Sequence, residues 1–178
     1  MNREELIAPQ KYNLVSEMER FAQDSSRKAI LWENEEGDTK EITYRELLKN
    51  ANRIGNVFLE NGLKQGDVVL VVVPRLIEAY QVYIASLKMG LVVIPSSEML
   101  RAKDFQYRIT HGDVKAIVSY APYTNEFAGL EEAKGLPKFV IGESREGWIF
   151  LDEEMKSAPE DFPLAATERD DMAFLSYT

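Results

Sequence analysis

Histidine and cysteine, two residue types that often serve in acid–base, metal or nucleophilic chemistry, are almost absent from this sequence. It contains one histidine, His111, and no cysteine. A lone histidine cannot supply a two-histidine metal site, and without cysteine the chain can form no thiolate metal site, cysteine nucleophile or disulfide. We therefore interpret His111 as a surface residue or an internally hydrogen-bonded one, and zinc hydrolase chemistry is disfavoured.

Three more candidates follow apolar runs that end in proline. Arg75 stands after Pro74, and Ser96 and Ser97 stand after Pro95. In an open parallel sheet, ligands bind beyond the carboxyl ends of the strands, so these positions are candidates for ligand contact. Arg75 could contact an anion or lie in solvent at a helix start. The two serines have no base beside them in the sequence, and we expect turn or capping roles for them.

Glycine-rich nucleotide motifs are missing from the sequence. No Gly-x-Gly-x-x-Gly follows a strand-like run, and no Gly-Lys-Ser or Gly-Lys-Thr occurs. Neither dinucleotide binding nor ordinary P-loop binding is therefore indicated. The residue pattern alone indicates a fold class, and a fold class does not specify a function.

Four short apolar runs, rich in β-branched residues, predict buried parallel strands. They begin 23, 25 and 23 residues apart and are apolar on both alternating faces, as strands covered on both sides must be. The segments between them have helical periodicity, which predicts βαβ crossovers. We expect an α/β fold, a parallel sheet with helices on both faces. The runs are Val68 to Val73, Leu91 to Ile94, Ala116 to Val118 and Phe139 to Ile141.

The helical segments of this region are expected after each of the first three runs. One carries an apolar stripe from Leu76 to Leu87 and ends at Gly90. A second follows Asp104 and a third follows Thr124. Residues 63–142 thus predict a series of βα units.

Residues 1–62 predict a helix, a β-hairpin and a second helix. A helix is expected behind a possible Asn13 cap, to about Gln23. A turn-rich segment, 34–38, separates the two strand-like runs of the hairpin. Thr43 and Glu46 have capping-box spacing at the start of the second helix, which ends near residue 62. The strand-like runs are Ala29 to Glu33 and Lys40 to Tyr44.

Negative charge is concentrated near the end of the sequence. The formal net charge is −9, and residues 143–171 hold ten Asp and Glu against three Lys and Arg, which leaves −2 for residues 1–142. We interpret 143–171 as a solvated acidic connector and 172–178 as a final strand. Because nucleic acids bind clustered basic surfaces, the charge disfavours a nucleic-acid partner.

Targeting and membrane signals are not found in the sequence. The first ten residues contain no apolar core of a secretory signal, and no apolar run approaches the roughly 20 residues that a membrane helix needs. We expect a cytoplasmic protein with no membrane span.

Several segments, taken in order, resemble the adenylate-forming enzymes, a family of acyl-CoA synthetases, amino-acid adenylation domains and luciferases. Residues 42–47 resemble its early Thr-Tyr-x-Glu-Leu element. Residues 66–95 resemble its Gly-Asp-x-Val strand and its Lys-x-Gly…Pro helix-to-strand step. Residues 174–178, Phe-Leu-Ser-Tyr-Thr, resemble the strand that leads into the family's ATP phosphate loop, Ser-Gly-Thr-Thr-Gly-x-Pro-Lys. Residues 74–75 and 102–109 look most like acetyl and medium-chain acyl-CoA synthetases.

This resemblance implies an AMP-forming acyl-CoA synthetase that uses ATP, Mg²⁺ and CoA. A short- or medium-chain carboxylate would attack the α-phosphate of ATP, and the CoA thiol would then displace AMP. Thr178 would begin the ATP phosphate loop, and Arg101 would contact a phosphate of CoA unless it lies in solvent. Glu98 and Met99 replace glycines that the acetyl-type enzymes place in the loop before Arg101.

The resemblance also implies that residues 1–178 are one incomplete N-terminal portion of an AMP-binding domain. The family's metal-binding glutamate and catalytic lysine lie in later segments, so we expect this chain alone to be inactive. We expect surfaces that later segments normally cover to make the chain a homo-oligomer. The alternative is a stand-alone α/β binding or interaction module without catalysis.

Overall fold

A five-stranded parallel sheet lies at the centre of the computed structural model, which describes residues 7–177. The strands lie in the order β4-β3-β5-β6-β7, and each pairs in parallel with its neighbours. The four predicted strands are confirmed; the sequence does not predict β7. The strands are β3 (Val68–Val72), β4 (Val92–Pro95), β5 (Val114–Tyr120), β6 (Lys138–Ile141) and β7 (Ile149–Phe150).

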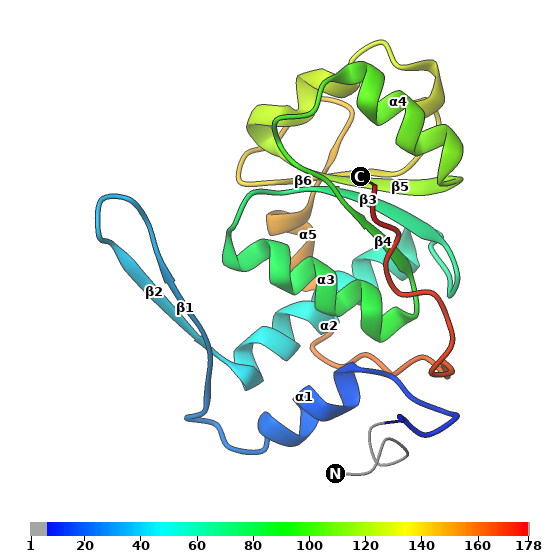
Figure 1. The fold of residues 1–178 in the computed structure, drawn as a ribbon. Coiled ribbons are helices and arrows are strands. Elements are labelled where there is room, and N and C mark those ends of the chain that lie inside the picture. The colour runs from blue at the N-terminus through cyan, green and yellow to red at the C-terminus, as the bar shows by residue number, and fades with distance from the viewer. Residues whose placement is uncertain (1–6, 178) are drawn as a thin grey trace.

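Side chains of β3, an interior strand, are buried on both faces of the sheet. In β3, Val69 and Val71 belong to one apolar core, and Leu70 and Val72 belong to the other. All four are fully buried. The first core is shared with the helices on one face, and the second with α4 (Ala102–His111) on the opposite face (Figure 1). Double burial explains why the run shows no polar alternation.

The first two crossovers are helical, as predicted. α3 (Ile77–Met89) joins β3 to β4, and α4 joins β4 to β5. The prediction of a third helix after Thr124 is wrong, because β5 is followed by two short 3₁₀ segments, η2 (Ala121–Phe127) and η3 (Glu131–Ala133). Gly129 separates them with a φ of +79°, a left-handed conformation that ends helical winding.

The region before the sheet has the predicted order of a helix, a hairpin and a second helix. α1 (Val15–Phe21) comes first, and β1 (Lys28–Glu33) pairs antiparallel with β2 (Thr39–Thr43). The hairpin projects from the body of the molecule (Figure 1). The longest helix is α2 (Tyr44–Glu60), which packs with α3 on the same face of the sheet.

The predicted capping box begins α2. The Thr43 hydroxyl accepts a hydrogen bond from the backbone N–H of Glu46, at 3.2 Å, and the Glu46 carboxylate accepts one from the backbone N–H of Thr43, at 3.0 Å. The bonds that the Glu46 carboxylate accepts from the backbone N–H and the hydroxyl of Thr43 hold the pKa of Glu46 below its usual value. Two free N–H groups at the start of the helix are thereby satisfied, which explains why this boundary is readable in the sequence.

The region interpreted as a solvated acidic connector contains regular structure. It includes β7 and a further helix, α5 (Leu151–Ser157), whose first residue is buried. Three carboxylates occupy its first turn, where the partial positive charge of a helix N-terminus stabilises them. The connector interpretation is therefore wrong for 149–157, because those acidic residues mark a helix start.

Residues 158–171 run along the helices of the same face. The backbone N–H of Ala165 donates to the carbonyl of Lys88 at 2.8 Å, and the ring of Phe162 lies against Gly55 in α2. The buried Asn13 side chain joins three segments, because its amide donates to the carbonyls of Leu87 and Ala165. This part of the connector is thus packed against the fold.

The expected final strand over 172–178 is reduced to one parallel bridge between Val93 and Phe174. Val93 N–H donates to the carbonyl of Ala173, and Leu175 N–H donates to the carbonyl of Val93, each at 2.9 Å. Residues 173–175 are therefore extended along the outer edge of β4, but their pairing is too short to form a strand.

Candidate functional site

The strand order defines where a ligand crevice is expected. Chain order reverses between β3 and β5, since β4 lies on one side of β3 while β5 and β6 continue on the other. Open α/β sheets bind ligands outside the carboxyl ends of the strands at such a reversal. The segments that lead away from this point are 73–76 after β3 and 121–127 after β5. Arg75, Ser96 and Ser97 all follow strands that end at this edge.

Arg75 is exposed on the loop between β3 and α3. Its carbonyl accepts a hydrogen bond of 2.6 Å from the Trp32 indole, so its backbone anchors the projecting hairpin to the sheet. Within residues 7–177, its guanidinium takes part in no ion pair. The structural role of Arg75 thus belongs to its backbone.

Ser96 and Ser97 differ in their surroundings. The Ser97 hydroxyl accepts a hydrogen bond of 3.2 Å from the backbone N–H of Met99, which confirms the predicted turn role. The Ser96 hydroxyl is buried and has no hydrogen-bond partner among residues 7–177, so the capping role predicted for it is wrong. Its backbone N–H instead continues the sheet by donating to the carbonyl of Val71, at 2.9 Å.

Arg101 lies at the N-cap of α4, with its side chain 64% exposed. One guanidinium nitrogen donates to the carbonyls of Met99 and Leu100, at 3.0 Å each. The nearest carboxylate, Glu126, is 4.0 Å away and also accepts from the backbone N–H of Ala102. The guanidinium therefore stabilises its own loop, and the first helix amide already faces a carboxylate.

The extended segment 173–175 brings the end of the described chain to α4. Tyr177 lies against the last turn of that helix, where its hydroxyl is 3.0 Å from Nδ1 of His111. Burial raises the pKa of the Tyr177 phenol. This contact confirms that His111 is internally hydrogen-bonded. The sequence does not reveal the partner, because 66 residues separate the two side chains and no local pattern connects them. Thr178 lies outside the described residues.

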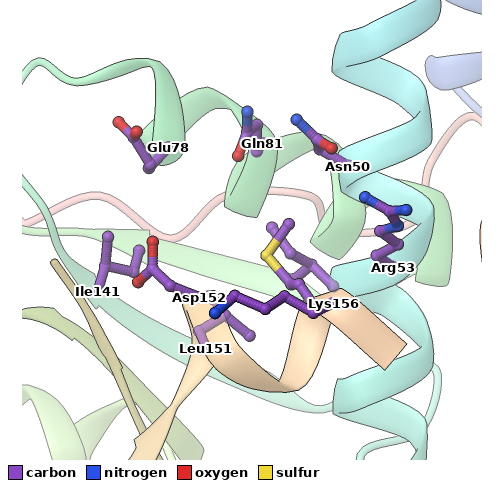
Figure 2. Close-up of a pocket in the computed structure, with 10 residues that line it drawn as sticks. Asn50, Arg53, Glu78, Gln81, Ile141, Leu151, Asp152 and Lys156 are labelled. Atoms are coloured by element: carbon purple, nitrogen blue, oxygen red, sulfur yellow. The ribbon is translucent and has the colours of Figure 1, made fainter. Parts of the chain in front are cut away.

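A cavity of about 250 Å³ lies between α2, α3 and α5 (Figure 2). Most of its charged lining is partnered: Arg53 contacts Glu160 at 2.6 Å, and the Asp152 carboxylate accepts from the backbone N–H of Gly142. Gln81 is buried in the wall. The pairing of the charges favours a structural role for this cavity. The full lining is Asn50, Arg53, Ile54, Glu78, Gln81, Ile141, Leu151, Asp152, Met155 and Lys156.

The family model for AMP-binding enzymes, described as "AMP-binding enzyme", matches residues 18–178. The chain belongs to the AMP-binding enzyme family. It is 47% identical over 178 residues to an uncharacterized acyl–CoA ligase, YtcI of Bacillus subtilis, covering all of this chain and 34% of that protein. It is 29% identical over 163 residues to the human mitochondrial acyl-coenzyme A synthetase ACSM1, covering 84% of this chain and 28% of that protein.

Solved structures of acyl-CoA ligases share the fold of this chain. The anthranilate CoA ligase AuaEII, in complex with anthranoyl-AMP, superposes with a TM-score of 0.88 at 20% identity, covering 100% of this chain and 34% of that one. An acyl-CoA synthetase of Brucella canis gives the same TM-score at 21% identity, covering 98% and 33%. The chain thus spans about a third of the length of the relatives it matches.

The described part of this chain shows no cluster of metal-ligating side chains. Over residues 7–177, no three His, Asp or Glu side chains are placed to hold a metal ion. Over the same residues, no helix has the length and apolar character needed to cross a membrane.

Proposed function

We propose that this chain is the N-terminal portion of a longer AMP-forming acyl-CoA ligase. The observation that carries this proposal is the 47% identity to an acyl–CoA ligase over the whole chain, together with the family match over residues 18–178. The ligase would join a short- or medium-chain carboxylic acid to CoA, with ATP converted to AMP and pyrophosphate. The resemblance of 102–109 to medium-chain and acetyl-type enzymes supports this substrate class.

The reaction proceeds in two displacements. A carboxylate oxygen attacks the α-phosphorus of ATP and pyrophosphate leaves; the CoA sulfur then attacks the acyl carbon and AMP leaves. Catalysis of the first step depends on alignment and on donors preorganised around the phosphates. This chain contributes the scaffold: the sheet and α4 hold residues 173–177 in a fixed path.

Two contacts with ligands are part of the proposal. Thr178 would begin the ATP phosphate loop, and Arg101 would contact a phosphate of CoA. The exposure of the Arg101 guanidinium supports this, and binding would exchange its bonds to the Met99 and Leu100 carbonyls for charge-assisted ones. Ligands for Mg²⁺ would come from other parts of the complete protein. The cytoplasmic location stays a prediction.

The complete protein is expected to exchange labelled pyrophosphate into ATP only when a carboxylic acid is present. We expect the highest rates with straight-chain acids of short to medium length, and no exchange above background with residues 1–178 alone, because the phosphate loop is not among them. A radioactive exchange assay with a panel of straight-chain acids measures this. A folded complete protein that exchanges with none of the acids would contradict the proposed activity.

We also propose that residues 1–178 self-associate through an apolar patch beside segment 173–175, which covers the outer edge of β4. Phe174 is 46% exposed in this patch, and its ring lies 6.5 Å from that of Tyr83, which in turn lies 6.5 Å from the exposed Tyr80. Exposed apolar patches promote pairing of chains. Light scattering is expected to give about twice the 20.3 kDa chain mass, and Phe174→Glu is expected to return it to the monomer value. A monomer of the unmodified chain at high concentration would contradict the proposal.

A further inference from the structure

The last turn of α4 holds the chain at Tyr177 by more than a single contact. The Tyr177 hydroxyl is 3.0 Å from Nδ1 of His111, and the two rings meet edge to face at 5.6 Å. The Tyr107 ring meets that of Tyr177 edge to face at 5.8 Å. The guanidinium of Arg108 lies 4.9 Å from the centre of the same ring. We refer to Tyr107, Arg108, His111 and Tyr177 as the α4 clamp.

The backbone at the end of α4 permits this close approach. A Cβ at Gly112 would lie 3.2 Å from the Tyr177 hydroxyl and 2.6 Å from Cδ1 of Ile94. Only glycine leaves room for both neighbours, so the Tyr177 ring reaches the helix end without displacing the core. Burial at this site also removes Nε of Arg108 from solvent.

Backbone pairing to β4 ends before Tyr177. The two hydrogen bonds of Val93 engage Ala173 and Leu175, and the one bridge is at Phe174. Two residues further on, the side-chain contacts with α4 are what fix the direction of the chain. The α4 clamp therefore fixes the path of the described chain at Tyr177.

We propose that His111 is a positioning residue for the ATP phosphate loop, acting through its hydrogen bond to the Tyr177 hydroxyl. This rests on the proposed function, in which the loop follows Thr178. The hydrogen bond between Nδ1 of His111 and the phenolic hydroxyl orients the Tyr177 ring between the helix end and β4. His111 touches neither nucleotide nor acid; it acts through Tyr177.

The first test measures the clamp itself, without any enzymatic reaction. Hydrogen–deuterium exchange of the peptide 172–178 is followed in residues 1–178. Tyr177→Phe removes only the hydroxyl, and His111→Leu removes the hydrogen-bonding nitrogen together with the ring that meets Tyr177. Tyr177→Phe is expected to speed exchange of this peptide roughly three- to tenfold, the factor that one net hydrogen bond is worth, and His111→Leu by at least as much. His111→Asn keeps an acceptor close to the Nδ1 position and is expected to restore protection.

Thr110→Ala is the matched control. Thr110 lies in the same turn of α4, and its hydroxyl donates to the carbonyl of Gln106 in its own helix, away from the α4 clamp. Exchange of 172–178 is expected to stay unchanged in this variant. Unchanged exchange in both Tyr177→Phe and His111→Leu would overturn the proposal.

The second test measures positioning in the complete protein. Tyr177→Phe and His111→Leu are expected to raise the KM for ATP roughly three- to tenfold in pyrophosphate exchange, with kcat nearly constant, and His111→Asn is expected to recover most of the loss. A role in folding alone would lower the amount of active protein and leave the KM for ATP unchanged, which would overturn the proposal. Failure of the unmodified protein to exchange pyrophosphate into ATP would instead refute the proposed function. Hydrogen–deuterium exchange of peptide 172–178 would still test the α4 clamp in that case.

Discussion

Replacing Phe58 by alanine is expected to lower the free energy of unfolding by about 3–5 kcal/mol. Phe58 is fully buried in α2, and its ring lies 4.8 Å from that of Phe139 in β6, also fully buried. The pair joins the longest helix to the sheet at the centre of the larger apolar core. Removal of the ring loses its transfer free energy and leaves a cavity that the rigid sheet beneath cannot close.

Urea denaturation of residues 1–178 measures this difference. Leu31→Ala is the control, because Leu31 is 65% exposed on the projecting hairpin, and a change within about 0.5 kcal/mol is expected there. A loss below about 1 kcal/mol for Phe58→Ala, with an unchanged dependence on urea, would show that α2 is not held to the sheet in the way described. The prediction also concerns function, since the same sheet carries Val93, the attachment point of residues 173–175.

The elements that can be predicted from the sequence are those with a local cause. The strand over Val68–Val72 is readable because every side chain in it must be apolar, and α2 is readable because Thr43 and Glu46 bond each other's backbone. The helix α5 is harder to predict because its three acidic residues resemble solvated charge, although acidic residues also favour a first helical turn. The 3₁₀ segments after β5 resemble a helix in the sequence because short apolar spacings do not distinguish the two windings.

The candidate site is less predictable, because its contacts are made between distant segments. The role of Ser97 follows from its turn chemistry, which depends on the next two residues only. The surroundings of Ser96 do not, since its burial depends on the packing around the edge of the sheet. His111 and Tyr177 each stand out in the sequence, but their contact requires residues 172–177 to turn back along β4. The sequence alone does not predict that path of the chain.

Replacing Gly90 by alanine is expected to destabilise the chain by about 2–5 kcal/mol. Gly90 ends α3 with a φ of +72°, where an L side chain costs about 1–2 kcal/mol. A Cβ there would also lie 2.9 Å from Cγ of Gln65 and 3.0 Å from Cγ2 of Thr167, and such overpacking adds about 1–3 kcal/mol. The glycine predicted only as a helix terminator therefore has a second role, which is to let residues 165–167 cross the end of α3.

Gly62→Ala separates the two contributions. Gly62 follows α2 with a φ of +87°, and a Cβ at this position would have no neighbouring atom within 4 Å, so only the backbone cost of about 1–2 kcal/mol is expected. Urea denaturation measures the free energy of unfolding of both variants. The difference between their two losses of stability is the contribution of segment 165–167. Equal losses of stability in the two variants would mean that segment 165–167 can shift to accommodate a methyl group without cost. A larger loss at Gly90 means that the crossing segment is fixed, and with it the path that leads through 173–175 to the α4 clamp.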